Sequence, residues 1–242
     1  MTITNDKKLG AIVASNYKAA EVFEKYGLDF CCKGFKTITE ACEEKGIETE
    51  VLITELENAL KNAELEDGKF NDMSLTDLTT YIVSTHHAYV KRIMPLVQAH
   101  VRKVSTVHGL NHAELREIEK IFDKIVGDFT AHLQKEEMIL FPYITAMERA
   151  INENGMPPKA FFGTVENPIN MMEAEHDTAG NELEMIKELT NHYTPPSDAC
   201  TTYRVMLQEL NEFTRDLHQH VHLENFILHP KAKAMEKKLL GL

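Results

Sequence analysis

Two stretches of the sequence share one pattern: His132-Leu-Gln-Lys-Glu136-Glu-Met-Ile-Leu-Phe-Pro142 and His220-Val-His-Leu-Glu224-Asn-Phe-Ile-Leu-His-Pro230. Both read His-x3-Glu-x2-Ile-Leu-x-Pro, and they begin 88 residues apart. Residues four apart lie on the same face of a helix, so each histidine can reach the same point as its glutamate. The repeat therefore predicts two halves of one metal site, each on a helix that ends at its proline.

The composition is that of a globular protein with no affinity for polyanions. The 242 residues have room for one large domain, or for a standard domain with a small one. The formal net charge is −12 and no basic cluster appears, so neither nucleic acid nor a membrane surface is expected as partner. No apolar run has the length of a membrane span, and the N-terminus has no signal-peptide core. We expect a cytoplasmic protein.

Residues 1–66 are predicted to form a small helical domain. Ser15 or Asn16 caps a first helix that ends at Gly27. Thr37-Ile-Thr-Glu40 is a capping box that opens a second helix, which Gly46 ends. A third helix runs from Glu50 to Asn62, and a polar link follows over 64–72.

Residues 74–236 are predicted to form a second domain of four long helices. The first runs from Ser74 to about Thr106, and the second starts at Asn111. Along the second helix, apolar residues recur at alternating steps of four and three, and His132 and Glu136 fall within that seam. The third helix starts at 167–168, and the fourth carries a stripe from 210 to 227. Since no β-alternation appears, the fold class is all-α, an up-down-up-down four-helix bundle.

Each of these helices offers one inward histidine. His176 is the only histidine on the apolar face of the third helix, whereas the first helix offers both His86 and His87. The stripe through His87 is apolar throughout and the stripe through His86 is more mixed, which favours His87. With His87, the four histidines are spaced by 45, 44 and 44 residues.

Polar side chains in a helix seam are costly unless they are paired or bind a metal ion. The predicted ligands are His87, His132, Glu136, His176, His220 and Glu224. Four imidazoles and two carboxylates suit two iron ions, each with two imidazoles and with the glutamates as bridges. Manganese or zinc suits the same ligands, although the lack of a thiolate cluster argues against structural zinc. Glu137 corresponds to Asn225 in the repeat and is not expected to be a ligand, and Glu173 is placed outside the ligand set or at the surface.

The motifs along the chain resemble those of the iron–sulfur cluster repair di-iron proteins, the repair-of-iron-centres family. They are Phe30-Cys31-Cys32-Lys33-Gly34, His132-x3-Glu136-Glu-x-Ile-Leu-Phe-Pro142, Met172-Glu173-x-Glu175-His176-Asp177-x-Ala179-Gly180, Tyr193-Thr-Pro-Pro196, Cys200-Thr-Thr202 and His220-x-x-Leu223-Glu224-Asn225. One departure is His229, which stands where the repeat leads us to expect phenylalanine.

The resemblance implies a Cys-Cys domain followed by a hemerythrin-like bundle. It implies an oxo- and carboxylate-bridged centre of two non-haem iron ions, held by the six residues named above. It also implies a bacterial stress-response role, in which iron–sulfur proteins damaged by nitric oxide or oxidants are the clients. O₂ or NO are the small ligands expected, and a homodimer is compatible with this arrangement.

The adjacent cysteines Cys31 and Cys32 allow two interpretations. A disulfide between neighbours is strained, because a trans peptide sets their Cα atoms about 3.8 Å apart. A buried turn is one alternative; the other, favoured by the resemblance, is a pair of thiols exposed on a loop that bind iron or exchange with a partner. Cys42 and Cys200 are expected to be buried, and His108, His112, His192, His218 and His222 to be surface residues, of which His222 can lie near the site.

Other functions remain open at this point. A carrier or sensor of O₂ or NO fits the bundle but has no use for a Cys-Cys domain. An enzyme that reduces NO fits two irons, yet no flavin or nicotinamide motif is present. We favour a repair protein that donates iron or handles NO over a turnover enzyme, and a zinc or structural site is the alternative without redox chemistry.

Overall fold

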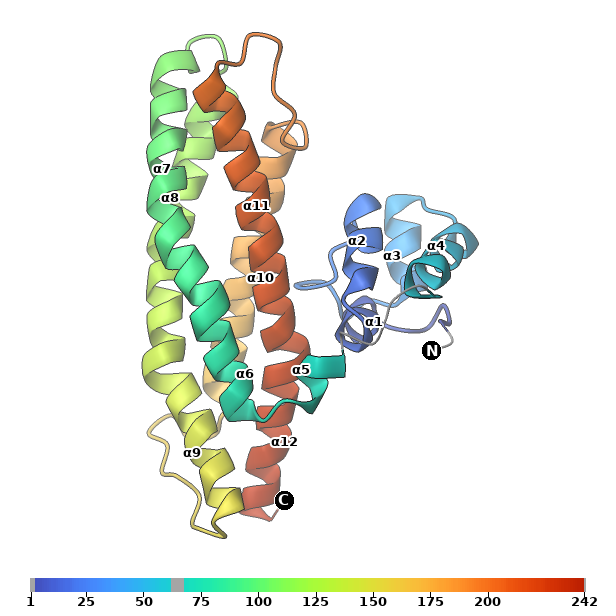
Figure 1. Cartoon of the computed structure of the whole chain (residues 1–242), viewed down its shortest axis with the longest axis vertical. Helices are drawn as coiled ribbons and strands as arrows, with labels where there is room; N and C mark the ends of the chain where they lie inside the picture. Colours follow the sequence, from blue (N-terminus) through green and yellow to red (C-terminus); the bar gives the residue numbers. More distant parts are fainter. Residues whose placement is uncertain (1–2, 62–67, 242) are drawn as a thin grey trace.

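The structure, a computed structural model, describes residues 3–61 and 68–241. These residues form helices and connecting loops without a strand, apart from one isolated antiparallel bridge between Lys8 and Thr37. Figure 1 shows a long helical bundle with a small helical domain against one side. The prediction of an all-α fold with a four-helix bundle is confirmed.

The small domain contains α1 (Leu9–Ser15), α2 (Lys18–Lys25), α3 (Ile38–Lys45) and α4 (Thr49–Lys61). Thr37 and Glu40 form the expected capping box of α3, and Gly46 ends it in the left-handed conformation. The helix α1 was not predicted; its apolar residues Leu9, Ile12 and Val13 are buried. The predicted end of α4 at Asn62 and part of the polar link lie outside the described residues. Residues 68–72 of that link form the short helix α5 (Gly68–Asp72).

Three of the four long rods of the bundle join several helical segments, and the other is a single helix. The first consists of α6 (Leu75–Ile82), η1 (Val83–His87) and α7 (Ala88–His108). The second consists of α8 (Glu114–Lys135), η2 (Glu136–Leu140) and α9 (Phe141–Asn152). The third is α10 (Glu166–Leu189), and the fourth consists of α11 (Thr201–Leu223), η3 (Glu224–Leu228) and α12 (His229–Leu240). Within the described residues, none of the helices has the length and apolarity that a membrane span needs.

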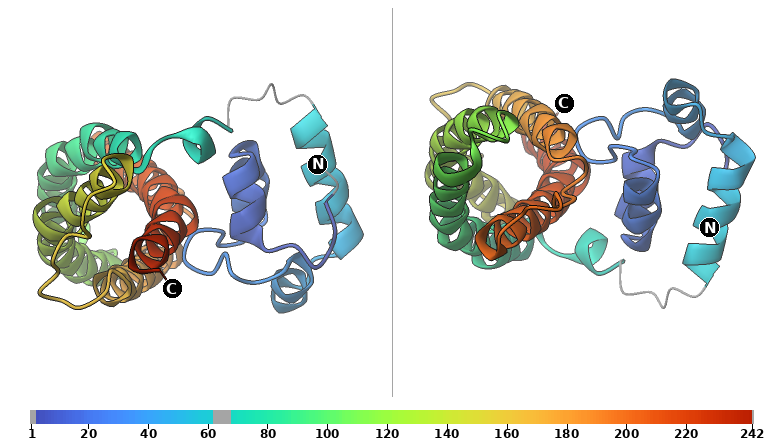
Figure 2. Two further views of the ribbon diagram at one scale, coloured as in Figure 1. Left: turned by 90° about the horizontal axis from the view of Figure 1, so that it is seen from below. Right: turned by 90° about the horizontal axis from the view of Figure 1, so that it is seen from above.

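The four rods form a closed ring in the end-on views of Figure 2. Around the ring α7 contacts α8, α8 contacts α10, α10 contacts α11, and α11 contacts α7. The apolar seams of all four rods face inward, and the polar residues within those seams lie at one level, where the segments η1, η2 and η3 occur. This arrangement positions the site.

The two prolines of the repeat do not end their helices, so that expectation is wrong. Pro142 and Pro230 stand in the first turn of α9 and α12, directly after the π-helical segments η2 and η3. A π-helical turn changes the hydrogen-bond register, so the missing N–H of proline falls where a new helical segment begins. The rods therefore continue past the site, and such π segments are frequent at functional sites.

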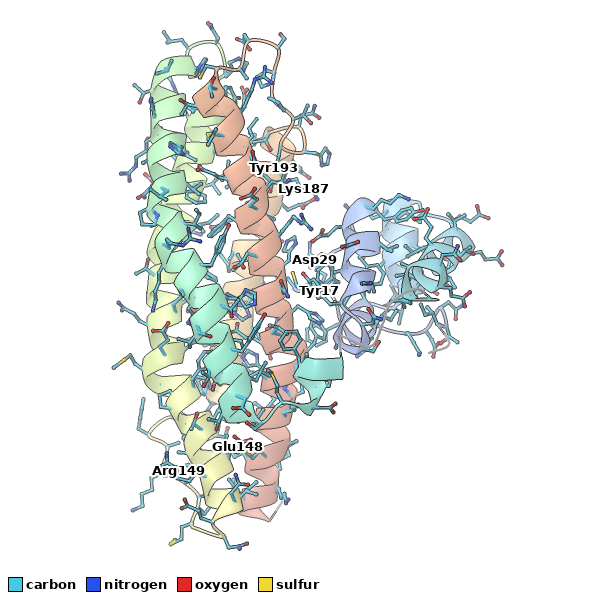
Figure 3. All side chains as sticks on the ribbon, in the orientation of Figure 1. Tyr17, Asp29, Glu148, Arg149, Lys187 and Tyr193 are labelled. Atoms are coloured by element: carbon cyan, nitrogen blue, oxygen red, sulfur yellow. The ribbon has the colours of Figure 1, made fainter. Side chains whose placement is uncertain are left out.

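The start of the first rod is capped from two sides. The Ser74 hydroxyl accepts a hydrogen bond from the Asp77 N–H at 3.0 Å. The carboxylate of Glu148, labelled in Figure 3, accepts hydrogen bonds from the N–H groups of Leu75 and Thr76, both at 2.8 Å. Glu148 belongs to α9, so this cap also fixes the first rod against the second.

Phe226 of η3 packs against the small domain. Its ring lies 5.0 Å from the Phe35 ring and 5.2 Å from the His222 ring, centroid to centroid. A Cβ atom on Gly10 or Gly34 would come within 2.6 Å of the Phe226 ring. These two positions therefore need glycine for the small domain to approach the fourth rod.

Candidate metal centre

The six predicted ligands meet inside the bundle. Their side chains are buried, none more than 1% exposed. Three of them belong to the π-helical segments: His87 ends η1, Glu136 begins η2 and Glu224 begins η3. His132 and His220 lie one turn before the two glutamates, as the repeat requires, and His176 lies in the middle of α10.

The ligand atoms divide into two groups that share both glutamates. His87, His220, Glu136 and Glu224 form one group, and His132, His176, Glu136 and Glu224 form the other, with the ligand atoms of each group within 4.8 Å of one another. Glu136 Oε2 lies 3.4 Å from His87 Nε2 and 3.3 Å from His132 Nε2. Glu224 lies 3.0 Å from His220 Nε2 through Oε1 and 3.2 Å from His176 Nε2 through Oε2. Each glutamate therefore reaches both groups, as a bridging carboxylate does.

Three of the four imidazoles are oriented by a partner on Nδ1. His87 Nδ1 lies 2.6 Å from the Glu137 carboxylate, and His132 Nδ1 lies 2.9 Å from the Glu175 carboxylate. Because a carboxylate only accepts, Nδ1 carries the proton and Nε2 presents its lone pair inward. His220 Nδ1 is buried and has no hydrogen-bond partner among the described residues.

His176 is oriented by an amide in place of a carboxylate. Its Nδ1 donates to Asn225 Oδ1 at 2.9 Å, while Asn225 Nδ2 donates to the Cys31 carbonyl at 3.3 Å. The second bond fixes which way the amide points, so Asn225 presents its oxygen to the imidazole. His176 Nε2 therefore also faces inward as a lone pair.

The inward atoms fit a cation. Two pairs of Nε2 atoms, His87 with His220 and His132 with His176, lie 3.1 Å apart. Both oxygens of Glu136 are buried without a hydrogen bond among the described residues. Lone pairs and carboxylates that face one another in a buried space repel unless protons or metal ions lie between them. The ligand set of imidazole and carboxylate suits iron, and this arrangement offers it two adjacent positions.

The pKa shifts of the candidate ligands also indicate that the site favours positive charge. Burial lowers the pKa of His87, but the nearby carboxylates of Glu136 and Glu224 raise it to about 10. Burial likewise lowers the pKa of His132, and Glu136 raises it to about 10. Burial and Glu224 raise the pKa of Glu136, but His132 and His87 lower it to about 2. Without a metal ion His87 and His132 therefore retain protons, and metal binding displaces them.

His86 belongs to neither ligand group. It is 1% exposed, and its Nδ1 lies 3.0 Å from Asp216 Oδ1. Its ring stacks on the His220 ring at 5.5 Å, with an interplanar angle of 7°. His86 therefore packs directly against the candidate ligand His220 without joining either group.

Other predicted positions differ from the structure. His222 was expected at the surface but is 1% exposed, between Phe226 and Phe30, because the small domain covers it. Burial lowers the pKa of His222 to about 3. Glu173 is partly buried and lies 3.2 Å from His229 Nδ1, outside the ligand groups as predicted.

Three of the four cysteines differ from the favoured expectation. Cys31 and Cys32, for which exposed thiols were favoured over a buried turn, are buried at 1% and 9% exposure because their loop packs against α10. The Cys32 thiol donates to the His176 carbonyl at 3.4 Å. Cys42 is buried as expected, whereas Cys200 is exposed and lies 3.2 Å from His108 Nε2, because it precedes α11 in an end loop of the bundle.

Sequence reasoning missed the residues that orient the ligands. Glu137 and Asn225 each follow a bridging glutamate, and each binds a histidine of a different rod. The repeat itself contained this signal, since the position after each glutamate is polar although the adjacent seam is apolar. Glu175 is next to His176 in the sequence, but its carboxylate accepts a hydrogen bond from His132.

A cavity of about 290 Å³ lies beside the centre. Phe129, His132, Lys135, Glu175 and Ala179 are among its lining residues. It therefore lies between α8 and α10, next to the ligand residue His132 and to Glu175, which orients it.

Imidazoles and carboxylates that converge from four helices define a metal-binding four-helix bundle protein. The family described as hemerythrin HHE cation binding domain matches residues 78–232, and ScdA_N, a domain of unknown function (DUF542), matches residues 5–60. The chain belongs to the iron–sulfur cluster repair family of hemerythrin-domain proteins.

Relatives of this family share both parts of the chain. The iron-sulfur cluster repair protein YtfE of Yersinia pseudotuberculosis serotype IB (strain PB1/+) is 34% identical over 227 residues, which are 94% of this chain and 96% of that protein. The protein of the same name from Yersinia pestis (strain Pestoides F) has the same identity and coverage. The prediction of the family from the sequence motifs is confirmed.

Proposed function

We propose that this protein repairs damaged iron–sulfur clusters by means of a non-haem di-iron centre. Its ligands are His87, His132, Glu136, His176, His220 and Glu224. The observation that carries the proposal is the sharing of Glu136 and Glu224 by two histidine pairs. The names of the relatives, iron-sulfur cluster repair proteins, support the same role for this chain.

In this proposal the centre contains two iron ions with carboxylate and oxo bridges. Such ions supply redox chemistry and open coordination positions for O₂ or NO. Glu137, Glu175 and Asn225 hold the imidazoles in the tautomer that binds metal, and the burial of all six ligands excludes bulk water. The cavity beside His132, of about 290 Å³, has room for a diatomic ligand.

In this proposal the two domains have different roles. Residues 1–66 form the Cys-Cys domain and residues 74–236 the di-iron bundle. Cys31 and Cys32 act as thiols that receive or exchange iron, and the clients are iron–sulfur proteins damaged by NO or oxidants. A cytoplasmic location fits such clients, and a homodimer is compatible with the exposed surface.

Iron content is the first test. We expect about two iron ions per chain and a Mössbauer spectrum of coupled irons. The double variant Glu136→Ala/Glu224→Ala is expected to lose both ions and the ability to restore activity to a damaged iron–sulfur enzyme. The matched control is Glu117→Ala together with Glu188→Ala, two carboxylates on the outer faces of α8 and α10.

Three results contradict the proposal. Iron-loaded protein without any effect on damaged clusters, but with reversible O₂ binding, indicates a carrier or sensor. Multiple-turnover production of N₂O from NO indicates a reductase. Zinc in place of iron in protein purified from iron-replete cells indicates a site without redox chemistry.

A further inference from the structure

Three metal-ligating side chains meet outside the bundle centre. Cys31 Sγ lies 3.7 Å from Cys32 Sγ and 3.2 Å from Asp29 Oδ1. One ligand atom from each of the three residues lies within 4.8 Å of the other two. Figure 3 labels Asp29 at the junction between the small domain and the bundle. None of these residues contributes to the di-iron ligand groups.

The separation of the sulfurs matches a bound ion. A tetrahedral metal ion that binds two thiolates at about 2.3 Å holds the sulfurs about 3.8 Å apart. The observed 3.7 Å is far above the length of a disulfide bond, and both cysteines are free. The backbone N–H groups of Cys31 and Cys32 donate to Asp29 Oδ1 at 3.0 and 2.9 Å, so the carboxylate is fixed beside the two thiols.

The bundle is shaped to receive this loop. A Cβ atom on Gly180 would lie 2.7 Å from Cys32 Sγ, so only glycine leaves room for the sulfur. Glycine inside a helix costs about 1 kcal/mol relative to alanine, and Gly180 lies in the middle of α10. One turn earlier, His176 accepts the Cys32 thiol on its backbone carbonyl. The loop is thus seated against a metal-ligand residue of the bundle.

Of the three residues, Asp29 borders a cavity of about 360 Å³ between the two domains, whereas the two cysteines lie buried behind it. Asp29, Lys33, Gly180 and His218 are among its lining residues. Gly180 borders the same cavity, and Cys32 Sγ lies against Gly180. The cavity therefore adjoins the three side chains at Asp29 and leaves room beside Asp29 for a further ligand.

We propose that Asp29, Cys31 and Cys32 form a second metal site, which binds a thiophilic divalent ion at the junction of the two domains. Binding converts two thiols to thiolates and releases two protons, so the two thiolates, the carboxylate and the ion together carry one negative charge. A water molecule or a thiolate from a client, entering through the cavity, completes the four ligands. The identification of the physiological ion as Fe²⁺ rests on the proposed repair function; the existence of the site does not.

Cobalt(II) is the probe, because its bonds to sulfur absorb in the near ultraviolet and its bonds to nitrogen and oxygen do not. We expect the reduced full-length protein to show sulfur-to-cobalt charge-transfer absorption that saturates with one ion per chain at this site. Cys31→Ser and Cys32→Ser should each reduce the absorption, and the double variant should abolish it. Cys42→Ser, a buried cysteine of the same domain, is the matched control and should leave it unchanged.

Two subtler variants test the geometry. Asp29→Asn retains an acceptor for the two N–H groups but loses the charge, and we expect a fall in cobalt affinity of about tenfold or more. Gly180→Ala should weaken binding because it displaces the Cys32 sulfur. Competition with Fe²⁺ and with Zn²⁺ then ranks the two ions. Far-ultraviolet circular dichroism and iron loading of the bundle show that each variant is folded.

The failure of this inference is distinguishable from that of the proposed function. The bundle ligands contain no sulfur, so thiolate absorption reports the second site alone. If wild-type protein with titratable thiols shows no sulfur-to-cobalt absorption, or if Cys31→Ser/Cys32→Ser retains it, the second site is refuted whatever the bundle binds. If the absorption persists in Glu136→Ala/Glu224→Ala, the second site stands without the di-iron centre.

Discussion

Asn225 accepts a hydrogen bond from the imidazole of His176, and it donates another to the carbonyl of Cys31. One amide thus connects a ligand of the bundle centre with the cysteine loop of the small domain. We expect Asn225→Ala to weaken iron binding by about 10- to 100-fold, because the imidazole loses the partner that fixes its tautomer. Competition with a chelator measures the affinity. Unchanged affinity in Asn225→Ala contradicts the assigned role.

Asn225→Asp separates the two bonds of this amide. The carboxylate still accepts from His176 but cannot donate to Cys31, so iron affinity should return toward the wild-type value while the cysteine loop loosens. Hydrogen exchange of the loop amides reports the loosening. Gln208→Ala, an exposed position on α11, serves as control for both variants.

His87 and His86 are neighbours in sequence with different predicted roles. His87→Ala should remove about half of the bound iron, because one ion loses one of its two imidazoles. His86→Ala should retain the iron, since His86 binds Asp216 and stacks on His220 without joining a ligand group. Iron analysis of the two purified variants decides between them, and the reverse pattern makes His86 the ligand.

Phe226 fills the contact between the domains. We expect Phe226→Ala to cost about 2 kcal/mol and to loosen the small domain, because the ring packs against Phe35, Gly10 and Gly34. Faster hydrogen exchange in α1, with α8 unchanged, is the expected result. Phe161→Ala is the control, since that side chain is 86% exposed. Equal protection of α1 in the variant and the wild type contradicts the prediction.

Glu148 caps the first rod from α9. Glu148→Ala should lower stability by about 1–2 kcal/mol, because the N–H groups of Leu75 and Thr76 lose a charged acceptor at a helix N-terminus. Urea unfolding measures the change. Arg149→Ala alters the adjacent exposed position, labelled beside Glu148 in Figure 3, and should have little effect.

His112 contributes a pH-dependent contact at the far end of the bundle. Its Nε2 lies 3.1 Å from Asp198, and the hydrogen bond to Asp198, with a smaller contribution from Glu114, raises the pKa of His112. A raised pKa stabilises the folded protein fully below the unfolded value of about 6.5, and the contribution disappears as the pH rises through the folded value. The difference in Tm between wild type and His112→Gln should therefore be larger near pH 6 than near pH 9. An equal difference at both pH values excludes a charged contact.

The periodicity of the sequence predicted much of the ligand arrangement. The spacing of His132, Glu136, His220 and Glu224 placed each pair on one helix face, and their position in apolar seams required burial. The sequence also predicted helix capping, both the capping box that begins at Thr37 and the N-cap at Ser74. Both kinds of inference concern residues within about one helical turn of each other, where backbone geometry fixes the relation.

The sequence by itself determined the helices, the inward faces and the chemistry of the ligands, because these depend on residue types at fixed spacings along one chain. Only the tertiary structure decided that Glu175 serves His132, that Asn225 links His176 to Cys31, and that the cysteines are buried against Gly180. The structure also decided that the rods continue past the prolines of the repeat. The π-helical segments η2 and η3, which begin at the two glutamate ligands, lie directly before these prolines. Contacts between rods and domains depend on packing across the whole chain, which spacing within one helix does not contain.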